Sequence, residues 1–226
     1  MFAIAGKIVQ PDASFTDTQG TQYPPGWLRL ASAEDKAAVG AVEVIYIDQP
    51  PAGADIACIR TETFDGDRTV TATYTRRANA QIYPAIVQKI KAFRDDRCRT
   101  GGYKVAIAGS DYWLQSDAIS RVQQLGLKDQ ARDLLAAGGK MSDPIHMLGR
   151  PQVWKTLGGV FVPISAQAAF DIVAAAGAAD AGNFAAAQTH MANVAAAAQP
   201  ELYDWSTGWL ETYVPPVAHR AAAADR

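Results

Sequence analysis

The feature that most constrains the fold is a local pattern that occurs twice after residue 100. In its first occurrence, residues 103–108 read as a strand, 109–111 as a Gly-Ser-Asp turn and 112–115 as the returning strand. Ser116 has the side chain of a helix N-cap, and Asp117 adds negative charge to the first turn, where the helix dipole favours it. This pattern predicts a β-hairpin followed directly by a capped helix.

In the second occurrence, residues 152–156 and 160–164 flank the Gly-Gly pair at 158–159, which is typical of a hairpin turn. Ser165 can then cap another helix, and a separate helix of small residues is predicted over 183–198. We expect the two hairpins to share one antiparallel sheet, with the helices packed on one face.

The N-terminal part has the pattern of strands and loops. Over residues 69–75, threonine alternates with valine, alanine and tyrosine, the period of a strand with two unlike faces. The Asp-Gly-Asp sequence at 65–67 is a turn signal, and the β-branched run at 42–47 predicts one further strand. Residues 1–78 are therefore expected to form a small sheet with long loops.

A long amphipathic helix is predicted next. Pro84 suits its first turn, apolar residues recur at helical spacing between 82 and 93, and the Gly-Gly pair at 101–102 would end it. The overall prediction is an α+β chain with a β-rich N-terminal docking domain, residues 1–78, and an α+β C-terminal domain, residues 79–226.

Composition excludes several classes of protein. The formal net charge of −2 and the pI near 5.9 argue against a nucleic-acid binder, which would carry a basic balance. No apolar run reaches the roughly 20 residues that a membrane helix needs, and the N-terminus lacks the pattern of a signal peptide. Cys58 and Cys98 are expected to be free thiols of a soluble protein in a reducing compartment.

The sequence contains few patterns that are typical of catalytic or metal-binding sites. His146, His190 and His219 stand apart from one another and from cysteine, so we expect no metal and no cofactor. His146 is interpreted as a loop histidine bonded to the backbone or to water. There is no nucleophile elbow and no phosphate-binding loop, and the acidic pair at 95–96 lies among arginines on a helix. The chain is predicted not to be an enzyme.

Aromatic residues give the candidate contact sites. Tyr23 and Trp27 lie in a loop rich in proline and glycine, where they could anchor a partner protein, although Trp27 could equally pack into its own domain. Trp205 and Trp209 are spaced to share one helix face, and they either close the core or bind a partner. Both alternatives stay open from the sequence.

A tryptophan-centred motif links the two hairpins with the first capped helix. Its residues are Trp113, Ser116, Asp117, Ser120, Arg121 and Trp154. The segment resembles an uncharacterised C-terminal domain family of tailed-phage tail-fibre and tail-fibre-assembly proteins, over about residues 84–195. Physically, the motif can be a helix start in which Arg121 pairs with Asp117 at i, i+4, or it can bind a partner.

The resemblance implies a structural component of a bacteriophage tail: a fibre, a fibre adaptor or a baseplate-peripheral protein. Such a protein would be made in the host cytoplasm, would reside in the virion, and would be oligomeric through contacts with other tail proteins. One alternative is a tail-fibre assembly chaperone that leaves the particle. Another is an enzyme that degrades the cell wall during entry, which would need convergent carboxylates or a metal set that the sequence does not show.

Overall fold

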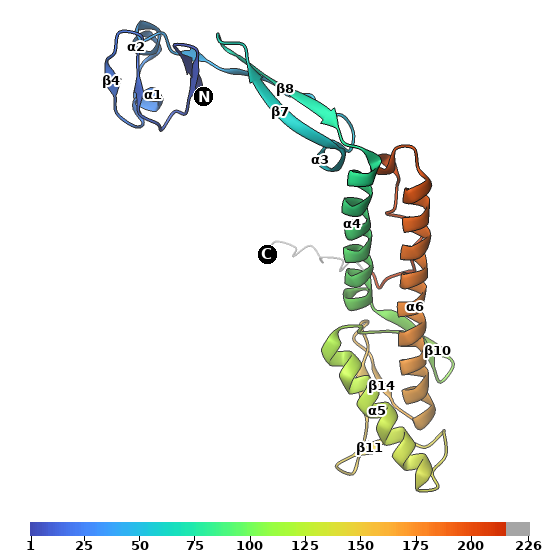
Figure 1. Ribbon diagram of the computed structural model, residues 1–226. Helices are drawn as coiled ribbons and strands as arrows, with labels where there is room; N and C mark the ends of the chain where they lie inside the picture. The colour runs from blue at the N-terminus through green and yellow to red at the C-terminus, as the bar shows by residue number, and fades with distance from the viewer. Residues whose placement is uncertain (216–226) are drawn as a thin grey trace, which may run out of the picture. The chain divides into compact units, whose positions relative to one another are not determined.

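A computed structural model describes residues 1–215 and shows the α+β composition that the sequence predicts. The chain divides into two compact units, Met1–Ile82 and the part that begins at Tyr83. The boundary falls inside helix α4 (Asn79–Thr100), close to the domain boundary expected after residue 78 (Figure 1).

The first unit opens with a small globule of short elements. Its core is formed by Ile4, Phe15, Leu28 and Val39. The elements are β1 (Phe2–Ile4), β2 (Lys7–Val9), β3 (Phe15–Thr16), β4 (Gln22–Tyr23), α1 (Trp27–Leu30), α2 (Ala33–Ala38) and β5 (Val42–Glu43). Strand β1 pairs with both β2 and β5, and β3 pairs with β4, in antiparallel ladders.

The rest of the first unit is a second sheet of order β6-β8-β7. Its elements are β6 (Ile45–Ile47), α3 (Ala54–Ala57), β7 (Cys58–Phe64) and β8 (Thr69–Arg76). Strands β7 and β8 form a hairpin around the turn expected at 65–67, although the sequence did not predict β7, and β6 runs parallel to β8. The prediction of one strand over 42–47 is wrong, because Val44 turns into the core beside Val70 and splits the run between two sheets.

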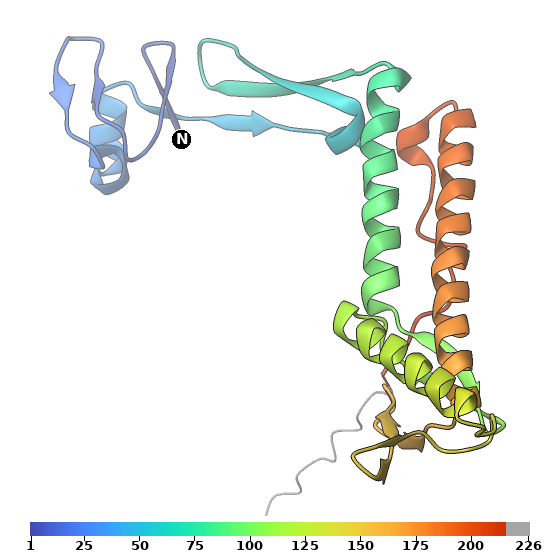
Figure 2. The same cartoon turned by 60° about the horizontal axis from the view of Figure 1, so that its bottom comes forward.

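The second unit combines three helices with small hairpins. Its elements after α4 are β9 (Tyr103–Ile107), β10 (Ser110–Leu114), α5 (Ala118–Ala136), β11 (His146–Met147), β12 (Arg150–Pro151), β13 (Val153–Lys155), β14 (Phe161–Pro163), α6 (Ala166–Ala196) and the 3-10 turn η1 (Pro200–Leu202). Helices α4 and α6 lie side by side in both views (Figures 1 and 2). The main core joins β9 to α5 and α6 and contains Tyr103, Leu114, Leu127, Ile164 and Ile172.

Both predicted hairpins exist, but they do not share one sheet. Strands β9 and β10 form one two-stranded ladder, and β13 and β14 form another. The backbone N–H of Leu157 donates to the carbonyl of Trp113 at 2.8 Å, and the side chain of Gln115 donates to the carbonyl of Lys155 at 2.9 Å. At Lys155, the edge of β13 is therefore bonded to the side chain of Gln115. In a continuous sheet, the main chain of a neighbouring strand would take this place.

Helix α6 is one continuous helix of 31 residues, so the prediction of a separate helix over 183–198 is wrong. Gly177 and Gly182 lie inside it. A Cβ on Gly182 would come within 2.5 Å of Leu210, so this glycine lets the C-terminal segment lie directly on the helix. Tertiary packing stabilises most helices in proteins, and here it outweighs the low helix propensity of glycine.

Two helix starts also differ from the prediction. Helix α4 begins at Asn79, so Pro84 lies inside it, near the N-terminal end. The N-cap of α5 is Asp117, whose carboxylate accepts from the backbone N–H of Ser120 at 3.0 Å and from its hydroxyl at 2.6 Å. The hydroxyl of Ser116 instead accepts from the backbone N–H of Gly102, at 3.0 Å, and Ser116 is buried.

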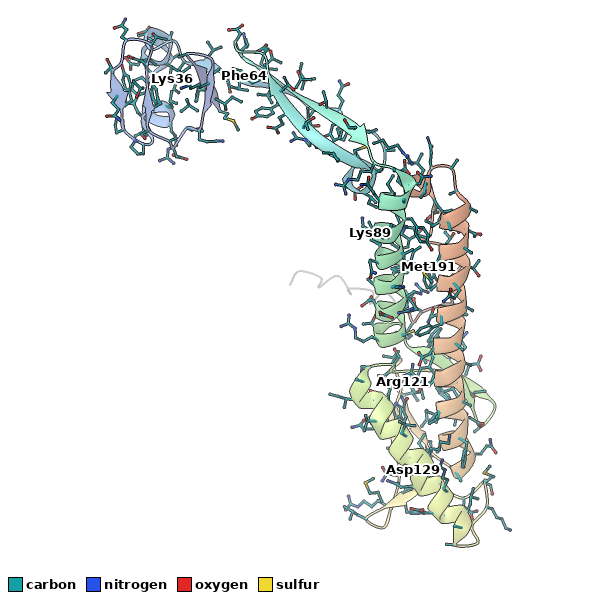
Figure 3. The ribbon with its side chains drawn as sticks, viewed as in Figure 1. Lys36, Phe64, Lys89, Arg121, Asp129 and Met191 are labelled. Carbon is teal, nitrogen blue, oxygen red and sulfur yellow. The ribbon has the colours of Figure 1, made fainter. Side chains whose placement is uncertain are left out.

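Arg121 does not pair with Asp117 as predicted. Its guanidinium lies 2.9 Å from a carboxylate oxygen of Asp180 on α6, and it also donates to the carbonyl of Ser116 at 3.3 Å. Figure 3 shows Arg121 near the start of α5, where this helix meets α6. Arg121 therefore connects the start of α5 to α6, while the carboxylate of Asp117 accepts its hydrogen bonds from Ser120.

We expect Asp117→Ala to lower the free energy of unfolding by about 1 kcal/mol, the usual effect of removing a helix cap. Asp117→Asn should keep most of the cap and lose its pH dependence. The hydrogen bonds from Ser120 lower the pKa of Asp117, so its contribution is complete above the carboxyl's unfolded pKa of about 3.9 and is lost as pH falls below it.

Denaturant unfolding followed by circular dichroism, at neutral pH and at successively lower pH, checks this. Asp129→Ala is the matched control, because Asp129 lies exposed on the same helix with an ion-pair partner, Arg132, at 3.0 Å. An equal loss in the Asp129 and Asp117 variants would contradict the assignment of Asp117 as the cap.

Candidate functional site

A groove of about 630 Å³ lies in the second unit. We name it the glutamine groove after four of its lining residues, Gln115, Gln123, Gln130 and Gln152. Helix α5 forms one wall, and strand β13 with its flanking residues forms the other. The motif residues Ser120 and Trp154 also line it.

The helical wall is one face of α5. Ser120, Gln123, Leu127 and Gln130 follow one another at spacings of three or four residues, which places them in one row along the helix. Gly126 lies beside this row, and a Cβ built on it would meet no atom within 4 Å. The missing side chain therefore leaves open space in the groove.

The side-chain amide of Gln115 holds the strand wall in place through two hydrogen bonds. Gln115 accepts from the indole N–H of Trp154 at 2.8 Å through its Oε1, and its Nε2 donates to the carbonyl of Lys155. Both polar ends of Gln115 are therefore occupied. In contrast, Oε1 of Gln130 is buried and has no hydrogen-bond partner among the residues that the structure describes.

The sequence did not predict this groove. The motif singled out Trp154 and Ser120, but the glutamines were missed, since amide residues at helical spacing carry no chemical signature of their own. The available signal was the row Ser120, Gln123, Leu127 and Gln130 beside Gly126 in a helix without another breaker. Trp113 lies elsewhere, against Tyr213, with ring centroids 6.1 Å apart.

The outer face of α5 is apolar and exposed. Ile119, Val122 and Leu125 are 73%, 69% and 51% exposed, at spacings that place them on one side of the helix. Across the groove, Phe161 of β14 is 64% exposed. Apolar side chains gathered in this way are typical of contact surfaces, whereas single exposed ones carry no such meaning.

A second surface lies on the β6-β8-β7 sheet of the first unit. The ladder registers place threonine and isoleucine alone on one of its faces. We name this the β-branched face; its residues are Ile45, Ile47, Ile59, Thr61, Thr63, Thr69, Thr71, Thr73 and Thr75. The hydroxyls of Thr61 and Thr73 bond across the strands at 2.7 Å. The three isoleucines are 45–51% exposed.

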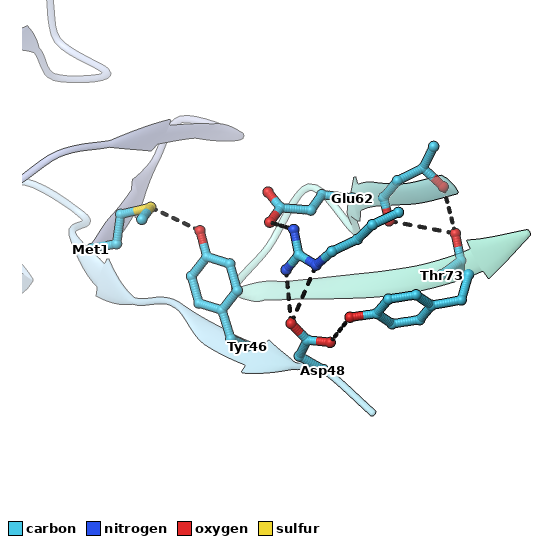
Figure 4. Close-up of polar contacts among 8 residues, drawn as sticks. Met1, Tyr46, Asp48, Glu62 and Thr73 are labelled. Atoms are coloured by element: carbon cyan, nitrogen blue, oxygen red, sulfur yellow. Dashed lines mark hydrogen bonds and ion pairs between the residues drawn. The ribbon is translucent and has the colours of Figure 1, made fainter. Parts of the chain in front are cut away.

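The charges of these strands lie on the opposite face. Arg60 lies 2.9 Å from the carboxylate of Asp48 and also pairs with Glu62, and Tyr74 donates to Asp48 (Figure 4). The hydrogen bond from Tyr74, followed by that from Arg60, lowers the pKa of Asp48. This arrangement resembles a surface ion-pair network more than a catalytic site, because its groups are exposed and mutually paired.

The predicted anchors Tyr23 and Trp27 contact each other and Phe15. The ring of Tyr23 stacks on that of Phe15 with centroids 4.8 Å apart, and Trp27 lies 4.6 Å from Tyr23. Both are partly buried against the core of the first unit. The geometry matches the alternative in which Trp27 packs into its own domain.

Trp205 and Trp209 do not share a helix, because the described chain has no helix at these positions. Both rings instead pack on Phe93 of α4, with centroids 5.5 and 5.1 Å from it. The indole of Trp209 donates to the carbonyl of Trp205 at 2.7 Å and also lies 5.0 Å from the ring of His190. This supports the alternative in which they close the core.

We expect Trp209→Ala to lower the free energy of unfolding by about 3 kcal/mol, because the ring fills space between Phe93 and His190. Leu202→Ala is the control, since Leu202 is 52% exposed and should change stability by less than about 0.5 kcal/mol. Thermal or denaturant unfolding measures both. A Trp209 variant as stable as the wild type would favour a role in partner binding.

Histidine and cysteine form no cluster within residues 1–215, where no group of three or more metal-binding side chains was found. His146 lies with Nδ1 3.0 Å from the carbonyl of Pro144, and His190 lies 3.0 Å from the hydroxyl of Tyr203. Cys58 and Cys98 are free, and burial, then the nearby carboxylate of Asp180, raises the pKa of Cys98. His219 lies outside the described residues.

None of the helices over the described residues is long and apolar enough to cross a bilayer. Comparison with curated proteins and with solved structures gives no match to the chain. A family model matches residues 62–207, which is more than half of the 226-residue chain, and it describes a domain of unknown function. The chain therefore belongs to the DUF4376 family of domains of unknown function.

Proposed function

We propose that this chain is a structural component of a bacteriophage tail that acts through contacts with other tail proteins and performs no catalysis. The β-branched face is the single observation that carries the protein-binding part of this proposal. The tail context rests on the resemblance of the motif around Trp113 and Trp154 to domains of tail-fibre and tail-fibre-assembly proteins.

The chemistry of the β-branched face suits a protein surface. Valine, isoleucine and threonine pack well on a pleated sheet, and sheets that pack face to face do so about 10 Å apart through such side chains. Lys, Arg, Asp and Glu are absent from the face itself, so a partner sheet would desolvate no ion there. The partner that fits is an uncharged, flat surface of a neighbouring tail subunit.

The proposed docking site is the β6-β8-β7 sheet of the first unit and not the aromatic pair that the sequence suggested. The N-terminal part remains the docking domain, but Tyr23 and Trp27 are largely engaged with Phe15. The exposed isoleucines and threonines of the β6-β8-β7 sheet take over the role that the sequence suggested for the aromatic pair. The virion tail is the proposed location, and nucleic acid and membranes are not proposed as partners.

Thr71→Lys tests the docking surface, because Thr71 is exposed on the central strand between Ile47 and Thr63. A buried lysine without a partner is costly, so the variant should be lost from particles of the phage that encodes the chain. Thr71→Val is the matched control, since it keeps the shape and the uncharged character and should be incorporated normally. Quantitative mass spectrometry of purified particles gives the result.

The same measurement separates the two roles in a tail. A fixed stoichiometry of the wild-type chain in particles supports the structural role. If the chain is absent from particles but fibres fail to form without it, it is an assembly chaperone. Equal incorporation of the lysine and valine variants would contradict the β-branched face as the docking surface.

A further inference from the structure

We infer that the glutamine groove binds an extended, uncharged polypeptide segment of a partner through its main chain. The inference rests on the proposed function only in taking the partner to be a protein. It uses the second unit and none of the residues of the β-branched face.

Strand β13 offers one edge for such a segment. The N–H of Thr156 donates to Val160, and that of Ile164 to Gln152, so alternate residues of this stretch bond toward β14. In an antiparallel ladder the residues between them turn their N–H and C=O to the other edge. Val153 and Lys155 are these residues, and the bond from Gln115 to the carbonyl of Lys155 shows that this edge faces the groove.

The side chain of Gln115 bonds to this edge of β13 in the way that we expect of a bound peptide. Its amide occupies the carbonyl of Lys155, as the N–H of a paired strand would. Val153 lies farther along the same edge and lines the groove, where an added strand can bond to it. Addition of a strand to an exposed sheet edge is a common way for proteins to bind extended peptides, because main-chain hydrogen bonds supply the affinity.

The facing wall supplies further amides. Gln123 and Gln130 project from α5, and Gln152 adds an amide from the strand side. Each primary amide has two donor hydrogens and an accepting oxygen, the same kinds of group that a peptide main chain presents. Oε1 of Gln130 is buried without a partner in the described residues, so it is an acceptor that an incoming N–H would satisfy.

Charge and size limit the ligand. Carboxylates are absent from the described lining, and its charged group is the ammonium of Lys155, which lies over the ring of Phe161. A cationic ligand would therefore have no carboxylate to pair with in this lining, and a strongly anionic ligand would have a single ammonium group. The volume of about 630 Å³ lies within the usual range of about 300–1,000 Å³ for ligand pockets, and Leu127 and Trp154 give it apolar surface.

The test uses the full-length chain and a displayed library of random linear peptides. We expect the wild type to enrich uncharged peptides, whose binding is then measured by calorimetry. Replacing central residues of an enriched peptide by their N-methyl forms should weaken binding by about 10-fold or more, because it removes main-chain donors. Undiminished binding by the N-methylated peptides would overturn main-chain recognition.

Gly126→Leu places a side chain in the open space of the groove without a clash at Cβ, and leucine favours a helix. It should abolish enrichment, whereas Gly126→Ala should retain it. Gly177→Leu on α6 is the matched control, because Gly177 also has no atom within 4 Å of a built Cβ and does not line the groove. Gln130→Met should fold and bind more weakly.

The other outcomes are decisive as well. Peptides that bind equally to the wild type and to Gly126→Leu would overturn the inference, as would failure to enrich any peptide. Binding of neutral oligosaccharides on an array, lost in Gly126→Leu, would assign the groove to glycans instead. Thr71→Lys should bind the peptides normally, so a failure of the docking proposal leaves this result unchanged.

Discussion

The close packing of small side chains along α6 is the constraint on which the second unit depends. Ala166, Ala168, Ala169 and Ala176 are buried in the core with β9 and α5. Alanine has little side-chain entropy to lose and the highest helix propensity, so a long alanine-rich helix can form and still let neighbouring elements approach closely. A larger residue at these positions would push α5 and β9 away, and overpacking of this kind commonly costs about 1–3 kcal/mol.

The position of α5 follows from this packing and from its start. Leu127 and Ala131 lie in the core, Asp117 caps the first turn, and Arg121 reaches Asp180 on α6. The ion pair is partly exposed, so its contribution is modest, and the apolar contacts supply most of the stability. With one face held on α6, the helix directs the row of Ser120, Gln123, Leu127 and Gln130 into the groove.

Each unit carries one candidate binding surface, and the two surfaces differ in shape and in the side chains that form them. The β-branched face is broad, uncharged and suited to a flat partner, whereas the glutamine groove is concave and lined by amides. The aromatic residues that the sequence suggested as anchors make ring contacts within their own units, Trp27 with Tyr23 and Trp209 with Phe93. Large aromatic side chains are common in both cores and interfaces, so the sequence alone could not decide between them.

Much of the local structure could be predicted from short stretches of the sequence. The alternation over 69–75 predicted β8, the turn signal at 65–67 marked its start, and the Gly-Gly pair at 158–159 predicted the β13–β14 hairpin, because periodicity and turn chemistry act within a few residues. The same alternation contained four of the nine residues of the β-branched face. The start of α5 was placed to within a residue, although Asp117 rather than Ser116 is its cap.

The contacts between distant residues became known from the folded chain alone. The fold places Arg121 on Asp180, leaves the two hairpins in separate sheets and joins two predicted helices into α6. The fold also places the row on α5 opposite β13, so that four glutamines far apart in the sequence line one groove. Contacts between residues far apart in the chain depend on how whole elements pack, and no short stretch of sequence contains that information.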